Sequence, residues 1–302
     1  MNTPDRSQVK SSRKISYIIN PATRCDAEQI AERIRAARPD GVEIEIAQTA
    51  EPGDAIRLAQ IAARTASLVV ACGGDGTVAD VTTGIFGTDV PLGIIPAGST
   101  NIIARDFGIP TRLESAIALT VGPHRLTTID VGRCGERCFL HIAGAGIDSR
   151  FFADTDRSLK RRIGWLAYLP PAARALRLPP ARFQLTVDER RTSVTSPLIL
   201  VANGGSIITP ALHLAENVRR DDGLLDLLIF TARGLGPVTR TLGALMTMQL
   251  TRSSHVVRLQ ARNISIEASP AMPIQLDGDV VAQTPAHFTI APAALQVATP
   301  IR

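Results

Sequence analysis

Aromatic residues are scarce in this 302-residue sequence, which has one Trp, two Tyr and eight Phe. Proteins that bind single-stranded nucleic acid stack the bases on aromatic side chains, so such a surface is poorly supplied here. Lysine is also rare, occurring only at Lys10, Lys14 and Lys160, and arginine carries almost all of the net charge of +5. Because genomic coding bias can produce the same pattern, the charge says little about partners, and we expect no nucleic-acid partner.

Long apolar runs and a metal-binding cysteine pattern are also missing. No stretch of about 20 apolar residues occurs, and the N-terminus has no apolar signal core. The cysteines are Cys25, Cys72, Cys134 and Cys138. They fit no zinc spacing, because the last two lack a second pair and His141 alone does not complete a site. We therefore predict a soluble cytoplasmic protein with structural thiols, and leave open a peripheral position at the inner membrane surface.

The most informative stretch runs from Ser67 to Asp80. Residues 67–72 are small or apolar and predict a buried strand, and the three glycines within 73–76 surround Asp75 before a helical pattern begins. The N–H groups at such a helix start favour phosphate, and glycine allows a close approach of the ligand. A polyphosphate would repel Asp75 unless a divalent cation lay between them. The stretch therefore predicts a nucleotide site with a metal.

The first part of the chain alternates strands and helices. Residues 1–14 are polar and predict a loose tail. Strands are predicted at 15–19, 42–46, 67–72 and 91–95, with helices at 26–37, from Gly53, behind the glycine turn, from Ile102 and at 113–119. This alternation is typical of a parallel sheet covered by helices. We expect an α/β nucleotide-binding domain at 15–128.

A second turn of small residues, 96–101, follows the strand at 91–95. Both turns would then lie at the carboxyl edge of one sheet, where open α/β sheets bind nucleotides. Gly98 permits close backbone approach, and Ser99 and Asn101 offer a hydroxyl and an amide. An ordinary helix cap would explain this turn taken alone. Its pairing with the first turn favours a ligand.

From about Thr128 the pattern changes to short strands separated by Gly, Pro, Asn and Asp. Strands are predicted at 130–132, 137–143, 183–187, 196–202, 224–230, 256–259, 264–268, 274–276 and 286–290. We expect an antiparallel β-sandwich at 129–292, with a last strand at about 293–302 that could return to the first domain. Helical insertions are predicted at 158–178 and 236–250. The first is basic and bears aromatic residues, so it fits either peripheral membrane contact or a surface helix.

Two acidic turns are the remaining candidates for catalysis, because the sequence has no Walker A lysine and no Gly-x-Ser-x-Gly nucleophile turn. Residues 221–223, Asp-Asp-Gly, could bind a cation together with turn carbonyls, or form a solvated turn. Residues 277–279, Asp-Gly-Asp, follow a short apolar strand and could aim carboxylates into a cleft. A kinase needs such a carboxylate to accept the proton of the acceptor hydroxyl. The same triplet also suits a simple hairpin turn.

Taken in order, these motifs resemble the diacylglycerol kinase catalytic-domain superfamily, in particular bacterial lipid kinases related to diacylglycerol and sphingosine kinases. The motifs that carry the resemblance are Asn20-Pro21, Thr49 with 53–55, 73–77, 96–101, 104–105, 222–223 and 277–278. The resemblance implies an N-terminal domain like those of NAD kinases and phosphofructokinases, followed by a β-sandwich. It also implies an ATP- and Mg²⁺-dependent kinase for a lipid hydroxyl, on diacylglycerol or a sphingosine-like lipid, with a role in phospholipid biosynthesis.

The resemblance further implies roles for single residues. The nucleotide-binding residues would be Asn20, Thr49, Gly73, Gly74, Asp75, Gly76, Thr77, Val78, Ala79, Asp80, Gly98, Ser99 and Asn101. Asp75 would also be a catalytic residue, as part of a Mg²⁺ network that reaches the second domain, towards Asp222. Asp222, with the carbonyls of Arg219 and Leu224, would hold Mg²⁺. The catalytic base would be Asp277 or Asp279, and the family usually has Glu at the second of these positions.

Several positions depart from the family pattern. Ala79 stands where Asn is common, Ser99 replaces a usual Thr, and Ile102 stands where diacylglycerol kinases often have Asp. Two alternatives therefore stay open, a kinase for a soluble acceptor such as NAD and a catalytically silent regulator that binds nucleotide or lipid. A homodimer also stays open.

Overall fold

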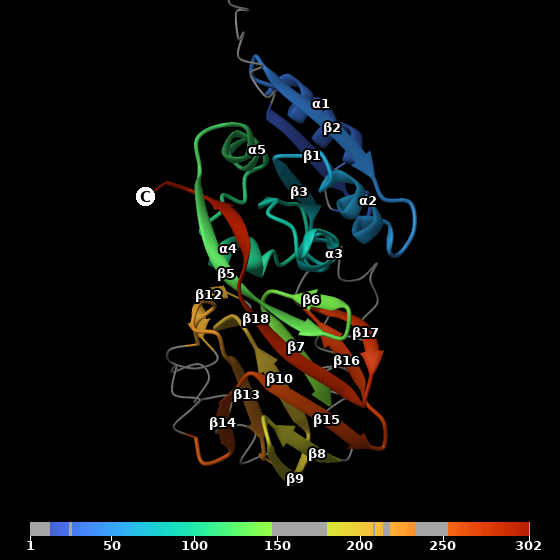
Figure 1. Cartoon of the computed structure of the whole chain (residues 1–302), viewed down its shortest axis with the longest axis vertical. Coiled ribbons are helices and arrows are strands. Elements are labelled where there is room, and N and C mark those ends of the chain that lie inside the picture. The colour runs from blue at the N-terminus through green and yellow to red at the C-terminus, as the bar shows by residue number, and fades with distance from the viewer. Residues whose placement is uncertain are drawn as a thin grey trace, which may run out of the picture.

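The computed structural model describes residues 13–23, 26–146, 180–207, 209–213, 218–232 and 253–301. Figure 1 shows an α/β part above a part built of strands. Residues 1–12 of the predicted tail, Cys25 and the predicted insertions at 158–178 and 236–250 lie outside the described residues. The last two residues of the predicted tail, Arg13 and Lys14, instead begin the first strand, because they pair with Val42 and Glu43. None of the helices within the described ranges combines the length and apolarity needed to span a bilayer.

A parallel sheet with helices between its strands forms the first part. The strands are β1 (Arg13–Ile19), β2 (Val42–Gln48), β3 (Leu68–Gly73) and β4 (Leu92–Pro96), in the order β2-β1-β3-β4. Each neighbouring pair is parallel. The helices are α1 (Ala27–Ala36), α2 (Asp54–Ala62), α3 (Asp75–Ile85), α4 (Ile102–Asp106) and α5 (Leu113–Val121). This confirms the predicted α/β class.

Both faces of this sheet are covered, because successive side chains of a strand point to opposite faces. Tyr17 packs with apolar residues of α1 and α5, whereas its neighbour Ile18 packs with those of α2 and α3. A strand covered on both faces needs a continuous apolar run. This explains why every residue of β3 is buried.

Two packed sheets form the second part. Their strands are β5 (Arg125–Cys134), β6 (Arg137–Phe139), β7 (Ile142–Gly146), β8 (Ala181–Val187), β9 (Arg190–Ser196), β10 (Leu198–Ala202), β13 (Leu225–Phe230), β14 (Val256–Ala261), β15 (Asn263–Ser269), β16 (Pro273–Leu276), β17 (Asp279–Gln283) and β18 (Ala286–Thr299). β11 (Ser206–Ile207) and β12 (Thr209–His213) pair with each other in a separate two-stranded sheet. One sheet has the order β14-β13-β10-β7-β16-β17 and is antiparallel. Phe139, Phe183 and Phe288 lie in the core between the two sheets. The predicted antiparallel β-sandwich is confirmed.

β18 links the two parts (Figure 1). Val297 pairs in parallel with Leu92 of β4. β5 pairs antiparallel with both halves of β18, up to Thr299, and β15 pairs antiparallel with its first residues. The sequence predicts two strands here, at 286–290 and 293–302, and the structure has one strand whose register shifts between Ala291 and Leu295. The side chain of Asp130 holds this irregularity by accepting the N–H of Ala293 at 2.7 Å. The two parts therefore share one continuous sheet.

Candidate active site

The turn after β3 brings the chain back close to the turn after β4. Ala97 donates its N–H to the carbonyl of Gly73 at 2.9 Å. A Cβ at Gly98 would lie 2.5 Å from the Cα of Gly74, and one at Gly73 would lie 2.4 Å from the Oγ1 of Thr77. A side chain at position 98 would therefore force the two turns apart, and one at position 73 would displace Thr77, which is the physical reason for glycine at these positions.

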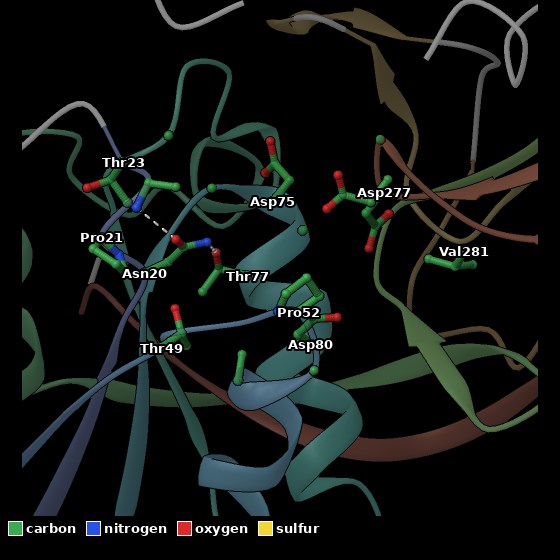
Figure 2. Close-up of a pocket in the computed structure, with 18 of the residues that line it drawn as sticks. Asn20, Pro21, Thr23, Thr49, Pro52, Asp75, Thr77, Asp80, Asp277 and Val281 are labelled. Carbon is green, nitrogen blue, oxygen red and sulfur yellow. Dashed lines mark hydrogen bonds between the residues drawn. The ribbon is translucent and has the colours of Figure 1, made fainter. Parts of the chain in front are cut away.

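Asn20, directly after β1, ties the β1 end to the start of α3. Its amide donates to Thr77 Oγ1 at 3.0 Å, and its Oδ1 accepts the N–H of Ala22 at 2.9 Å, as Figure 2 shows. Thr49, after β2, donates its N–H to the carbonyl of Ile19. The ends of β1, β2, β3 and β4 therefore meet at one edge of the sheet, as expected for a nucleotide site in an open α/β sheet.

Asp75 opens α3, and its carboxylate contacts the next helix. Its Oδ1 accepts the N–H of Ile103, in the first turn of α4, at 3.0 Å. Asn101, at φ 50°, precedes α4 and stabilises the turn after β4. Its side chain accepts the N–H of Gly98 and donates to the carbonyl of Gly98. Asn101 thus shapes the turn, and Ser99 lines the cleft beside it.

Asp277 follows β16 at φ 46°, and three backbone groups hold its carboxylate. The N–H groups of Leu140, His141 and Ile142 donate to it at 2.8, 3.0 and 2.9 Å. These bonds favour the ionised form. Removal from water outweighs them, and with the nearby Asp75 it raises the pKa of Asp277 to about 7. Such a carboxyl is poised to exchange a proton near neutral pH.

Asp279 lies against the first turn of α3. A Cβ at Gly76 would lie 1.7 Å from Asp279 Oδ2, so the two parts of the molecule touch here. One turn further along α3, Asp80 accepts a charge-assisted bond from Arg137 of β6 at 2.7 Å. Burial raises the pKa of Asp80, and the Arg137 charge opposes that rise.

A cleft of about 630 Å³ connects these groups. Its lining joins the ends of β1 and β2, the start of α3, the turn after β4 and residues 277–281. Figure 2 shows Asp75 and Asp277 opposite one another across it. The charged residues among the described lining are Glu51, Asp75, Asp80, Asp277, Asp279 and, as the single cation, Arg137. An anion that enters this cleft needs a cation with it.

Family models match both parts of the chain. The model described as the diacylglycerol kinase catalytic domain matches residues 14–134, and the model of the YegS C-terminal NAD kinase beta sandwich-like domain matches residues 141–299. The second match alone covers more than half of the chain. The chain belongs to the diacylglycerol kinase family. This confirms the resemblance that the motifs indicate. The family consists of lipid kinases, which are phosphotransferases.

Curated relatives agree with the family, and a solved structure agrees with the fold. A Mycobacterium tuberculosis protein named "Diacylglycerol kinase" is 31% identical over 80% of this chain and 80% of its own length. An Escherichia coli protein named "Probable lipid kinase YegS" is 28% identical over 94% of this chain and 96% of its own. The chain spans 55% of an uncharacterized Synechocystis protein, at 29% identity. A crystal structure of a diacylglycerol kinase from Bacillus anthracis shares the fold, with a TM-score of 0.74 at 23% identity over 95% of this chain and 97% of that one.

The cleft gathers most of the residues predicted from the sequence. Nine of the predicted residues line it: Asn20, Thr49, Gly74, Asp75, Gly76, Thr77, Asp80, Gly98 and Ser99. Asp277 and Asp279 line it from the other side. Val78 and Ala79 are buried in the α/β part and do not belong to the described lining, and neither does Gly73 or Asn101.

The predicted metal loop lies elsewhere. Arg219, Asp222 and Leu224 do not line the cleft, and Arg219 borders a separate cavity of about 470 Å³ beside Asp106. Arg219 pairs with Asp221 at 2.9 Å, and Asp222 accepts the N–H of Leu224 at 3.1 Å. Asp75 and Asp222, which the predicted Mg²⁺ network would connect, therefore share no cavity in the described part of the chain.

The cleft residues fit a hard divalent cation that arrives with a phosphate. The lining offers carboxylate, hydroxyl and amide oxygens, which are the ligands that Mg²⁺ prefers. Within the described ranges no three His, Cys, Asp or Glu side chains stand close enough to hold a metal by themselves. Mg²⁺ typically takes one or two carboxylates and completes its shell with water and phosphate oxygens.

Sequence reasoning missed two parts of the site. The N–H groups of residues 140–142, which hold Asp277, carry no sequence signal because every residue except proline has such a group. Arg137 was assigned only to a strand, and its approach to Asp80 depends on how β6 packs on α3. Neither contact is local in the sequence.

Proposed function

We propose that this protein transfers the γ-phosphoryl group of ATP to a hydroxyl of a membrane lipid, with Mg²⁺ as the cofactor. The observation that carries the proposal is the position of Asp277, which faces the glycine turn at the start of α3 across the cleft. The relatives named diacylglycerol kinase and lipid kinase support a lipid acceptor.

The glycine turn would bind the phosphates. The residue at the N-cap of α3 is Gly74, and no side chain at this position hydrogen-bonds the first N–H groups of the helix. N–H groups at a helix start, together with the helix dipole, favour phosphate oxygens. The side chains of Asn20, Thr77 and Ser99 would contribute hydrogen bonds around the nucleotide. When bound, Mg²⁺ supplies the positive charge that this acidic cleft lacks.

Asp277 would act as the base. The acceptor hydroxyl would give its proton to the Asp277 carboxylate while the hydroxyl oxygen forms a bond to the γ-phosphorus. At the same time the bond between that phosphorus and the bridging oxygen would break, and ADP would leave. Three N–H donors hold the carboxylate in place, and its pKa of about 7 lets it take and later release the proton. Asp279 would keep α3 and the 277–279 turn in register through its contact at Gly76.

The test is direct phosphoryl transfer. Radiolabelled ATP is offered with a lipid extract and, separately, with NAD, and the labelled product is identified by mass spectrometry. We expect labelled lipid from the parent protein and about 10²–10⁴-fold less from Asp277→Asn, the usual range for loss of a general base. Asp188→Asn is the matched control, because Asp188 also binds backbone N–H groups but lies at an exposed turn. Labelled NADP in place of lipid, or equal activity of Asp277→Asn, would overturn the proposal.

A further inference from the structure

Helix α4 contacts the cleft at its first turn and a buried polar cluster at its last. At the cleft, Ile103 donates its N–H to Asp75. At the other end, Asp106 is the last residue of the helix, and its side chain is only 6% exposed. The short helix lies at the junction of the two parts (Figure 1) and connects one cleft carboxylate, Asp75, with a second, buried carboxylate, Asp106.

Two groups of the strand part donate hydrogen bonds to the Asp106 carboxylate. Ser206 of β11 donates its hydroxyl to Asp106 Oδ1, and Arg220 donates to Oδ2 at 2.9 Å. His141 Nδ1 lies 3.5 Å from the same Oδ2. Arg220 also stacks on the ring of Phe107, with its Cζ 4.5 Å from the ring centre. Polar groups of the strand part therefore hold the end of α4 across the junction.

His141 connects these contacts of Asp106 to the cleft. Its Nε2 is bonded to the carbonyl of Ser206, and its own backbone N–H donates to Asp277 Oδ1 at 3.0 Å. Burial lowers the pKa of His141, which favours the neutral ring; its one N–H, on Nε2, donates to the Ser206 carbonyl, so the unprotonated Nδ1 that faces Asp106 adds no hydrogen bond there. The ring also lies against Gly204, where a Cβ would approach Nδ1 to 2.2 Å. The ring contacts and the bond to Asp277 therefore belong to one residue, so His141 connects the Ser206 contact with a group that holds Asp277.

These contacts form one continuous chain between the two carboxylates that face each other. The chain runs from Asp75 through Ile103 and α4 to Asp106, then through Ser206 to His141 and on to Asp277. Buried polar groups are costly unless they are satisfied, and a buried ion pair often adds little net stability compared with apolar packing. What a satisfied polar network does provide is one fixed arrangement.

We propose that Asp106, Ser206 and His141 are positioning residues that fix the separation of Asp75 and Asp277 during phosphoryl transfer. This rests on the proposed function, because it takes these two carboxylates to serve the transfer. Neither Asp106 nor Ser206 lies among the cleft-lining residues, so they act through Ile103 and His141. A displacement of about 1 Å can cost about 10²-fold in rate, so a small loosening is enough to be measured.

The test removes one link at a time and compares it with a matched link elsewhere. Ser206→Ala deletes the hydroxyl that holds Asp106, and Ser196→Ala deletes a hydroxyl buried in the sandwich that bonds Leu198 and Phe230. We expect Ser206→Ala to lower kcat at least about 10-fold with the KM for ATP within about twofold. Ser196→Ala should lower the unfolding temperature and leave kcat unchanged.

A double variant tests whether the residues act together. Asp106→Asn weakens the same link from the other side, and its matched control is Asp226→Asn, a buried aspartate that Arg258 pairs at 2.6 Å. We expect Ser206→Ala with Asp106→Asn to be no slower than the slower single variant, because both cut one link. Additive losses in kcat, or a KM for ATP that rises as much as kcat falls, would overturn the proposal.

Amide hydrogen exchange separates this proposal from the proposed function. In Ser206→Ala we expect exchange at Ile103 and at residues 140–142 to be about 10-fold faster, with no such change in Ser196→Ala. If the parent protein transfers phosphate to no acceptor, the proposed function fails, and the exchange result still decides whether the chain of contacts is mechanically coupled. Unchanged exchange at both places would contradict it.

Discussion

The carboxylate of Asp279 occupies the space in which a side chain at position 76 would lie. A Cβ on Gly76 would come within 1.7 Å of Asp279 Oδ2. Gly76 belongs to the first turn of α3 in the α/β part, whereas Asp279 opens β17 in the sandwich. This contact sets how closely the phosphate-binding turn and the Asp277–Asp279 turn approach each other.

Substitution of Gly76 should distinguish the steric effect of a side chain on Asp279 from the effect of helix propensity on stability. We expect Gly76→Ala to reduce phosphoryl transfer at least about 10²-fold, because the methyl group displaces Asp279 and widens the cleft. Alanine is favoured over glycine in a helix by about 1 kcal/mol. In the Asp279→Ala background, where the space is free, Gly76→Ala should therefore raise the free energy of unfolding by about that amount. Urea denaturation of the four proteins checks this, and equal effects in both backgrounds would contradict it.

The pH dependence of transfer should report Asp277. Its pKa is raised to about 7, so the carboxylate is protonated and inactive as a base below that pH. We expect kcat/KM to rise with pH and level off above about 7. Asp279→Asn should keep this acidic limb, and Asp277→Asn should lose it. A limb that moves only in Asp279→Asn would assign the base to Asp279 instead.

Stability should show the same pKa with the opposite trend. The folded-state pKa of Asp277 lies above the value of about 3.9 for an unfolded aspartate. The folded state therefore retains this proton over a pH range in which the unfolded state has lost it. Its contribution to the free energy of unfolding is fully present below about pH 4 and is lost as pH rises to about 7. Urea titrations at several pH values should show this loss in the parent protein and not in Asp277→Asn.

Removal of divalent cations should weaken nucleotide binding itself. The described lining of the cleft carries five carboxylates and one arginine, so a polyphosphate without its metal meets net repulsion. We expect EDTA to abolish transfer and to raise the Kd of ATP at least about 10-fold in a calorimetric titration, with Mg²⁺ restoring both. Adenosine, which has no phosphate, is the control and should bind equally with and without metal. An ATP Kd that ignores EDTA would contradict this.

Asp130 should be important for the strand that links the two parts. Its two carboxylate oxygens accept the N–H groups of Gly223 and Ala293, each at 2.7 Å, and the side chain is buried. Asp130→Asn replaces one acceptor with an NH₂ group, so one buried N–H loses its partner at a cost of about 1–3 kcal/mol.

The free energy of unfolding of Asp130→Asn is measured by urea denaturation, and Asp188→Asn is the matched control. At Asp188 both N–H donors share Oδ1, which asparagine retains, and the turn is exposed. We expect its free energy of unfolding to change by less than about 0.5 kcal/mol. Equal losses for the two variants would show that Asp130 does not hold the register shift of β18.

The sequence by itself determined the fold class and the glycine turn. The buried run of residues 68–73 and the glycines behind it obey local rules of burial and chain conformation, so strand, turn and helix follow from neighbouring residues alone. The alternation of strands and helices, and its change near Thr128, likewise reflects short-range patterns. These features required no knowledge of distant contacts.

Tertiary structure alone decided which groups meet. Asp277 is held by N–H groups 135–137 positions away, and Asp106 meets Ser206 and Arg220 at separations of 100 and 114. Such pairings depend on how the sandwich docks on the α/β part through β18, and they involve backbone groups that every sequence has. Folding placed Asp75 and Asp277 across one cleft and left Asp222 outside it, because distance in space, and not order in the chain, fixes electrostatic and hydrogen-bonding partners.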